Sequence, residues 1–447
     1  MLSKVHLMTR RLSLAPFCII YALTLVLSGA AASADSLGSR AEKTLVRVVQ
    51  AQEPSATALL EEIVNVNSGT MNFAGVRKVG EILRPRFEAL GFKTTWVDGA
   101  AFGRAGHLVA ERAGNGPHVL LIGHLDTVFE PNHPFQRFER IDQHIVRGPG
   151  ACDMKGGIVV GLTALAALKA ANALDTLHIT FVLHGDEEHA GAPLKLARAR
   201  IIEAAKAADI AIGLENADDD PTTAVTARRS AGRWLIKATG KSAHSSQIFA
   251  QETGAGAVYE LSRILDTFYD ELHTEQNLTF NPGLVVGSTQ VEFSPEPLSA
   301  SASGKDNIIA PQAIASGDLR ALTPQQITLA QQRMREIVAQ HLPNTQAEIT
   351  FDDGYPPMAP TDGNRRLLSM YDAVSRDLGY GPVTAVDPRR AGAADISFAA
   401  DHVDMAIDGL GLLGGNAHTP EEFADLRTFP IQTQRLAVLL YRLGKRK

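Results

Sequence analysis

Side chains that can bind metal ions lie close to the ends of predicted buried strands. His124 and Asp126 follow the apolar run 118–122, and Glu215 follows the apolar run 210–214. A histidine two residues before an aspartate can bind a metal through one ring nitrogen while the carboxylate fixes the other. A carboxylate directly after a buried strand is costly to bury unless it is paired or ligating. These residue types predict a metal site, although each motif alone also fits ordinary surface chemistry.

Two adjacent glutamates follow a third apolar run, 178–183, in the sequence Asp186-Glu187-Glu188. Neighbouring residues at a strand end point in different directions, so one glutamate can bind a metal while the other stays free. A free carboxylate close to metal-bound water is what a general base requires. The alternative is a solvated acidic turn.

Two further candidates lie in glycine-rich segments. Asp153, in the segment 148–157, precedes a predicted helix, where glycines permit close backbone approach. Both of its oxygens could face a pair of cations, or the residue could simply cap the helix. Cys152 beside it is either a nucleophile or a packed side chain, and we expect packing. His418 lies far along the chain, in the segment 414–420.

Together the motifs predict a single metal site. The expected ligands are two histidines and three carboxylates: His124, Asp153, Glu188, Glu215 and His418. This set suits two zinc ions bridged by one carboxylate and one water. Paired metals polarise a carbonyl and lower the pKa of the bridging water. Glu187 would take the proton of that water and pass it to the leaving amine.

The pattern of strands and helices predicts how these residues are positioned. Short apolar runs alternate with helical stretches over 35–223 and again over 353–447, which predicts an α/β catalytic domain with a mostly parallel sheet. The segment 224–352 has a different texture and is expected to be an inserted α+β domain. Within it, the segment 294–305, rich in serine, proline and alanine, is expected to be a loop. The predicted helices span 41–66, 74–90, 156–171, 255–269 and 325–341, and the predicted strands span 118–122, 178–183, 210–214, 233–239, 284–292 and 314–320.

The bulk composition excludes some partners. The chain has 447 residues and a net charge of -6 without a long basic run, so we expect no nucleic-acid partner. One of its two cysteines, Cys18, lies in the N-terminal segment described next, which leaves Cys152 without an internal disulfide partner.

The N-terminal segment 1–34 has the pattern of a signal peptide. Basic residues, including Arg10 and Arg11, precede an apolar run over 14–27, and the segment 32–34 is an Ala-Ser-Ala cleavage site. We therefore expect a periplasmic or secreted protein without a membrane anchor after cleavage. A retained anchor is the alternative, but the apolar run is short for a bilayer. The paired arginines weakly indicate twin-arginine export.

The motifs as a set resemble those of the zinc exopeptidase family that contains glutamate carboxypeptidase (carboxypeptidase G), aminoacylase, acetylornithine deacetylase and succinyl-diaminopimelate desuccinylase. The resemblance is closest to glutamate carboxypeptidase and covers nearly the whole predicted mature chain, in order and with similar spacing. It is carried by His124-x-Asp126, Gly148-Pro149-Gly150 through Asp153-x-Lys155-Gly156-Gly157, Asp186-Glu187-Glu188, Glu215 and His418.

The resemblance implies a role for each expected ligand. His124 and Glu215 would hold one zinc ion. Glu188 and His418 would hold the other, and Asp153 would bridge the two, giving two Zn²⁺ per subunit.

The resemblance also implies roles for residues around the metals. Asp126 would orient the first histidine, and Glu187 would be the general base. The inserted domain would be a lid and dimerisation domain, whose His244 stabilises the oxyanion in a neighbouring active site. Asn307 and Arg320 resemble residues that grip the substrate carboxylate, which a guanidinium can hold bidentately.

The function implied is that of an exported carboxypeptidase acting on a small peptide or an N-acyl amino acid. Glutamate is one candidate for the released residue. The chain departs from close relatives at 245–246, 294–305 and 390–395, which leaves that residue open. A deacylase or dipeptidase of the same family is the first alternative, and an inactive metal-binding homologue is the second.

Overall fold

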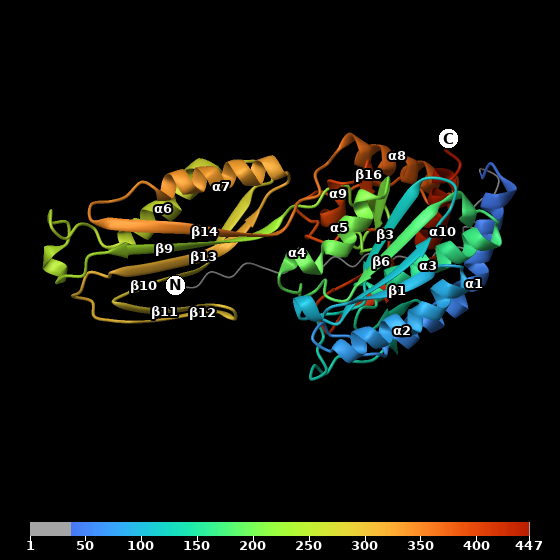
Figure 1. Cartoon of the computed structure of the whole chain (residues 1–447), viewed down its shortest axis with the longest axis horizontal. Helices are drawn as coiled ribbons and strands as arrows, with labels where there is room; N and C mark the ends of the chain where they lie inside the picture. The colour runs from blue at the N-terminus through green and yellow to red at the C-terminus, as the bar shows by residue number, and fades with distance from the viewer. Residues whose placement is uncertain (1–36, 447) are drawn as a thin grey trace, which may run out of the picture.

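The computed structural model describes residues 37–446, which form two main sheets, each packed against its own helices (Figure 1). The predicted signal peptide, 1–34, lies outside the described residues. Within the described range, no helix combines the length and the apolar character that crossing a membrane requires.

The larger sheet has six strands in the order β1-β2-β6-β3-β7-β16. Neighbours from β6 to β16 run parallel, whereas β1 and β2 are antiparallel at one edge. The predicted mostly parallel α/β sheet is therefore confirmed. Its strands are β1 (Lys93–Asp98), β2 (Gly106–Arg112), β3 (His118–His124), β6 (His178–His184), β7 (Ile210–Gly213) and β16 (Met405–Ile407).

Helices cover both faces of this sheet, because alternate strand residues point to opposite sides. In β3, Val119 and Leu121 pack into the core formed with α1, α3 and α10, whereas Leu120 and Ile122 pack into the core formed with α5 and α9. Both faces being buried explains the continuous apolar runs in the sequence. The helices of this part are α1 (Arg40–Val64), α2 (Phe73–Ala89), α3 (Lys155–Ala170), α4 (Leu194–Ala197), α5 (Ala199–Lys206), α8 (Asp362–Asp377), α9 (Ser397–Ala400) and α10 (Thr428–Leu443).

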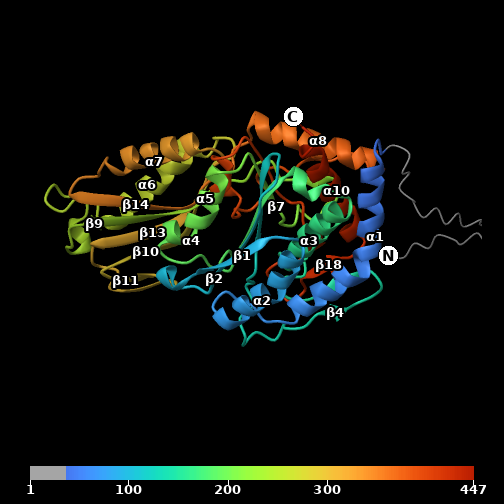
Figure 2. The ribbon, with the colours of Figure 1, turned by 45° about the vertical axis from the view of Figure 1, so that its right-hand side comes forward.

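The second main sheet is antiparallel, with the order β10-β13-β9-β14, and α6 and α7 cover one of its faces. We call this part of the chain the lid. The chain enters it at Ala231 and leaves it at Tyr355, and these two residues are paired, so both connections lie side by side (Figure 2). Its elements are β9 (Ala231–Gly240), α6 (Ala257–Leu272), β10 (Thr279–Ser288), β13 (Gln312–Arg320), α7 (Pro324–Val338) and β14 (Thr345–Tyr355).

The expectation of a loop over 294–305 is wrong. The segment belongs to a hairpin of β11 (Gln290–Pro295) and β12 (Leu298–Ser303), which pair only with each other. Every residue of β12 is exposed. A strand with no buried face has no alternation of apolar and polar side chains, and its pairing comes from backbone hydrogen bonds that composition does not reveal.

Short strands complete the described structure. A four-stranded sheet in the order β17-β18-β5-β4 joins the segments that surround His418 to the segment before Asp153. The remaining elements are β4 (Glu139–Arg140), β5 (Ile145–Arg147), β8 (Thr223–Ala224), β15 (Thr384–Ala385), β17 (Gly414–Gly415), β18 (Phe423–Asp425) and the 3₁₀ turns Ala100–Phe102, Leu174–Thr176 and Ser245–Gln247.

Candidate metal centre

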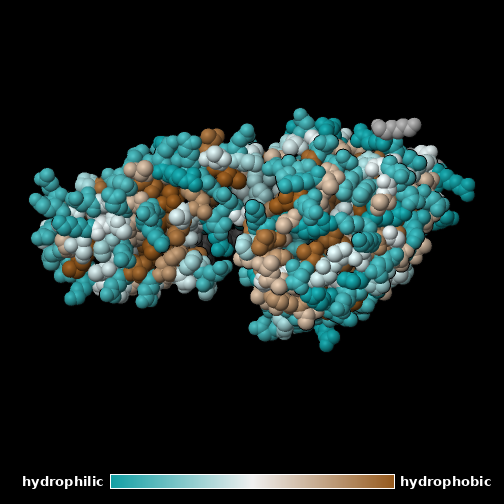
Figure 3. All heavy atoms as spheres, viewed as in Figure 1, coloured by the Kyte–Doolittle hydropathy of each residue, from teal (hydrophilic) through white to brown (hydrophobic). Residues whose placement is uncertain are grey.

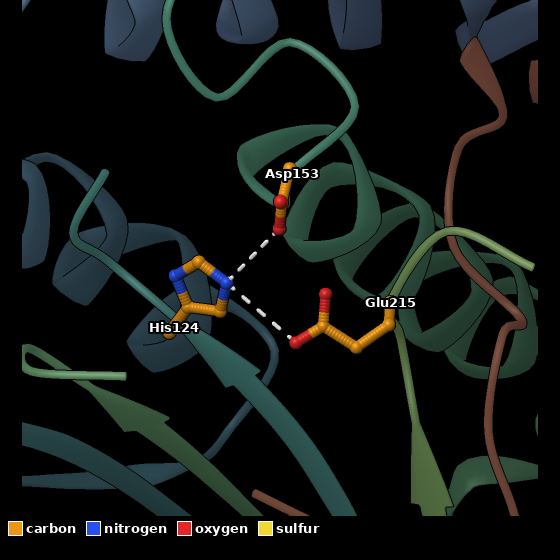
Figure 4. A group of neighbouring side chains, drawn as sticks. All are labelled: His124, Asp153 and Glu215. Carbon is orange, nitrogen blue, oxygen red and sulfur yellow. Dashed lines mark ion pairs between the residues drawn. The ribbon is translucent and has the colours of Figure 1, made fainter. Parts of the chain in front are cut away.

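Three of the expected ligands meet at the carboxyl edge of the larger sheet. His124 is the last residue of β3, and Glu215 follows the neighbouring parallel strand β7. Asp153 approaches from the segment before α3. The His124 Nε2 atom lies 3.4 Å from Asp153 Oδ1 and 3.6 Å from Glu215 Oε1 (Figure 4). The three side chains point toward a common centre and form a first group that could hold a metal ion.

A second group shares one of these residues. The His418 Nε2 atom lies 3.0 Å from the other Asp153 oxygen, Oδ2, and 3.0 Å from Glu188 Oε2. Asp153, Glu188 and His418 could likewise hold a metal ion. Because each oxygen of Asp153 faces one group, this carboxylate is placed between two candidate metal positions.

The chemistry of the donors fits two divalent cations. Each group offers one imidazole and two carboxylates, which zinc accepts, with room for a further ligand. Burial raises the pKa of Glu215 and of Glu188, and the nearby charge of Asp153 adds to the effect on both carboxyl groups. Hydrogen bonds to Asp153 and Glu188 raise the pKa of His418 to about 11. The carboxylates of Asp153 and Glu188 therefore favour positive charge at the position of His418.

Asp126 connects the first histidine to the two adjacent glutamates. Its carboxylate is fully buried and accepts a hydrogen bond from Thr70 Oγ1 at 2.7 Å. Its Oδ1 atom lies 3.4 Å from His124 Nδ1, and its main-chain oxygen lies 3.1 Å from the same nitrogen. The two carboxylate oxygens also accept the backbone N–H groups of Glu187 and Glu188, both at 3.1 Å. One aspartate thus fixes both the imidazole and the glutamate pair.

Glu187 has different surroundings from Glu188. Among the described residues, its carboxylate makes no hydrogen bond or ion pair, whereas that of Glu188 faces His418. Burial raises the pKa of Glu187 well above its usual value, and the nearby charge of Asp395 adds to the effect. A carboxylate with a raised pKa next to the candidate metal positions is suited to accept a proton.

Glu422 is a buried residue of the centre that the sequence did not single out. Its carboxylate accepts three backbone N–H groups, from Gly150 at 3.2 Å, Cys152 at 3.1 Å and Asp153 at 3.2 Å. Because Glu422 lies four residues after His418, it ties the segments of two ligands together. The sequence feature that could have identified Glu422 is a charged residue directly before the short strand β18.

The structure also bears on two alternatives in the segment before α3, namely whether Asp153 caps the helix and whether Cys152 is a nucleophile. The N-cap position of α3 is Met154, so Asp153 does not cap that helix. Cys152 is completely buried, and burial raises the pKa of its thiol well above the usual value. A buried thiol that stays protonated is a poor nucleophile, which agrees with the expectation that Cys152 is a packing residue.

The expected lid residues are not gathered at the metal centre. His244 lies four residues beyond the far end of β9, a ten-residue strand that spans about 30 Å. Asn307 lies beside it, since the Asn307 carbonyl accepts the N–H of Ser245 at 2.8 Å. Arg320 lies at the opposite end of the lid, one residue beyond the pair formed by Leu319 and Gly232. Figure 3 shows a hollow between the lid and the rest of the molecule on this face.

Comparison with known proteins identifies similar sequences. Residues 120–442 match the profile of peptidase family M20/M25/M40. Carboxypeptidase G2 from Pseudomonas sp. (strain RS-16) is 26% identical over 434 residues, which cover 95% of this chain and 98% of that protein. Succinyl-diaminopimelate desuccinylase from Acidiphilium cryptum (strain JF-5) is 34% identical over 141 residues, or 30% of this chain and 35% of that protein.

Solved structures show the same fold at lower identity. The aminopeptidase PepT of Bacillus cereus ATCC 10987 is similar with a TM-score of 0.68 and 18% identity, covering 88% of this chain and 99% of that one. The YXEP protein of Bacillus subtilis, described as a dinuclear metal binding peptidase, is similar with a TM-score of 0.62 and 17% identity, covering 88% of this chain and 98% of that one.

Proposed function

The chain belongs to peptidase family M20/M25/M40, and from this premise and the paired ligand groups we propose that it is a di-zinc carboxypeptidase. It would hydrolyse the amide bond before the C-terminal residue of a small peptide or an N-acyl amino acid. The observation that carries the proposal is the position of Asp153, whose two oxygens face His124 and His418. Similarity to carboxypeptidase G2 over 95% of the chain supports the carboxypeptidase class.

The five expected ligands would be shared between two metal ions. His124 and Glu215 would hold one ion, Glu188 and His418 the other, with Asp153 between them. When bound, two zinc ions would polarise the scissile carbonyl and make a water molecule acidic enough to react at neutral pH.

The remaining groups would move protons and hold the substrate. Glu187 binds neither metal ion in this proposal. It would take a proton from the attacking water and deliver it to the leaving nitrogen. Asp126 would keep Glu187 in place through the hydrogen bond from its backbone N–H. Arg320, at the end of the lid where the chain enters it, would grip the carboxylate of the substrate.

A second copy of the chain would complete the site. His244 and Asn307 lie at the far end of the lid from the junction with the catalytic part, which supports a role for them in the site of a partner chain. Exposed apolar side chains at β10, on α6 and just before α6 support a homodimer through the lid: Phe249, Val258, Tyr259, Tyr269 and Val285. β10 is also an edge strand, whose unpaired backbone groups favour pairing with another chain.

An N-acyl-amino-acid deacylase is the second candidate, favoured by the 34% identity to a desuccinylase over 141 residues. A panel of N-acyl amino acids, dipeptides and folate-like glutamates, assayed with and without a chelator, separates the two. A carboxypeptidase tolerates varied acyl groups, requires a free C-terminal carboxylate, and loses activity on the amidated substrate. A deacylase is selective for the acyl group. Absence of turnover on the whole panel by zinc-loaded protein would contradict both and favour an inactive homologue.

Export to the periplasm or the medium is part of the proposal and is supported by the sequence pattern of residues 1–34. N-terminal sequencing of the protein recovered from a native-like host checks it. A mature chain that begins at Asp35 is expected, and an uncleaved chain retained in the cell would contradict export.

A further inference from the structure

The backbone of the glutamate pair is held from a second side, by a residue of the lid. The Tyr355 hydroxyl donates a hydrogen bond to the main-chain carbonyl of Glu187 at 3.1 Å. Asp126 holds the N–H of the same residue. Both backbone groups of Glu187 are therefore engaged by side chains, although its own carboxylate has no hydrogen-bond partner among the described residues.

The Tyr355 hydroxyl is itself fixed by a buried cation. Arg198, which is fully buried, donates to the hydroxyl oxygen at 2.5 Å. The same guanidinium forms ion pairs with Asp186 at 2.9 Å and with Asp395 at 2.7 Å. The ring of Tyr355 packs edge-on against Phe398 at 4.9 Å between centroids. A hydroxyl held on both sides within this network has little freedom to move, so it fixes the carbonyl that it contacts.

The place of Tyr355 in the fold links this contact to the lid. Tyr355 is the last residue of β14, where the chain leaves the lid, and it pairs with Ala231, where the chain enters it. The pairing register shifts between Asp352 and Tyr355, so the strand end is bent as it reaches the catalytic part. We call this pair, Ala231 and Tyr355, the lid root. A change in its orientation would reach the Glu187 carbonyl through the side chain of Tyr355.

We propose that Tyr355 is a positioning residue for Glu187. Through its hydroxyl, the orientation of the lid root would determine where the Glu187 carboxylate lies when it accepts the proton. The inference rests on the proposed function of Glu187 as the general base. Among the described residues, the Tyr355 hydroxyl has hydrogen bonds with Glu187 and Arg198 and with none of the five expected ligands, so its proposed contribution is to the position of Glu187. An error of about 1 Å in such a group can lower a rate by roughly 100-fold.

Tyr355→Phe tests this role, because it removes the hydroxyl and keeps the ring that packs against Phe398. The expected result for the zinc-loaded variant is a fall in kcat of about 10- to 100-fold, with KM changed by less than about threefold, since substrate contacts stay intact. Zinc affinity, measured by titration calorimetry, should equal that of the wild type, because none of the five ligands is altered.

Tyr371→Phe is the matched control. Tyr371 is fully buried, whereas Tyr355 is half-buried, and the Tyr371 hydroxyl donates a hydrogen bond of 3.1 Å to Gln432 on α10. Both variants should melt at lower temperatures than the wild type, and only Tyr355→Phe should lose kcat. Equal kcat values in the two variants would overturn the positioning role.

A crystal structure of Tyr355→Phe provides a readout independent of turnover. Glu187 should be displaced or split between conformers while the five ligand side chains keep their places. An unmoved Glu187 would overturn the inference. Wild-type protein that hydrolyses no substrate would instead overturn the proposed function, and the displacement of Glu187 would still show whether Tyr355 positions it.

Discussion

Glu187 and Glu188 are neighbours in sequence, yet their side chains meet different groups. Asp126 holds both backbone N–H groups, which fixes the directions in which the two side chains leave the chain. Glu188 turns toward His418 at 3.0 Å, whereas Glu187 stays unpaired among the described residues. Identical side chains can therefore serve as a ligand and as a base because the backbone between them is fixed.

Glu187→Gln should separate these two roles. The amide has the same size but cannot take a proton, so kcat should fall by roughly two to four orders of magnitude, while the zinc content stays at the wild-type level. Single-turnover kinetics and elemental analysis measure the two quantities. The neighbouring Glu188→Gln should instead lower the zinc content. Near-normal turnover by Glu187→Gln would remove the general-base assignment.

The two groups of side chains that could hold metal ions were predicted from the sequence because residue type and place in the chain indicated the same site. His124 and Glu215 follow apolar runs, where a polar side chain needs a reason to be buried. Glu422 and Tyr355 could not be predicted in this way. Their contacts join segments about 270 and 168 positions apart, and neither lies in a pattern that indicates which partner it will meet.

At the scale of elements, the strands with buried faces were predicted correctly from the sequence, and the exposed or very short strands were not. Strands with two buried faces, such as β3 and β6, are continuous apolar runs and were predicted within two residues. The exposed strand β12 was missed because no face of it is buried. The short strands around His418 were also missed, since two or three residues are too few to show a period.

Glu260, at the start of α6, makes the stability of the lid depend on pH. Its carboxylate is fully buried, which raises its pKa, but hydrogen bonds from Arg263 at 2.7 Å and the Leu342 N–H at 2.8 Å outweigh burial and hold the pKa below its usual value. A depressed pKa in the folded state stabilises the fold above the unfolded pKa, near 4.5. That stabilisation is lost as the pH falls below 4.5 through the lower folded value.

Glu260→Gln should therefore lower the unfolding free energy at pH 7 by about 2 kcal/mol, the typical value of hydrogen bonds to a charged group. The deficit should shrink as the pH falls through and below 4.5. Denaturant unfolding across this range, monitored in the lid, measures it. Glu348→Gln, at an exposed position of β14, is the control and should have little effect at any pH. A deficit that stays constant with pH would contradict the assignment.

At the scale of the whole molecule, one chain does not bring all of the expected catalytic residues together. His244 lies about 30 Å along β9 from the root of its own lid. The chain enters the lid at Ala231 and leaves it at Tyr355, so within the described residues both connections to the catalytic part lie at the same end of the lid. The exposed apolar side chains on α6 and β10 indicate where a second copy would bind.

Complementation tests whether two chains share a site. His244→Asn and Glu187→Gln should each be nearly inactive alone. In a heterodimer, the subunit carrying His244→Asn keeps its own Glu187 and receives an intact His244 from its partner. Random reassociation should then restore about a quarter of wild-type activity, because half of the dimers are mixed and each has one complete site. A mixture as inactive as its components would contradict the shared site.

The paired metal centre is tested most directly by counting metal ions against activity. Protein freed of metal with a chelator should be inactive, and titration with Zn²⁺ should show two ions bound per chain with activity appearing as they bind. Asp153→Asn should fail to hold the pair, because one of its two donor oxygens is lost. Hydrolysis that continues without metal, or saturation at a single ion with full activity, would contradict the centre described above.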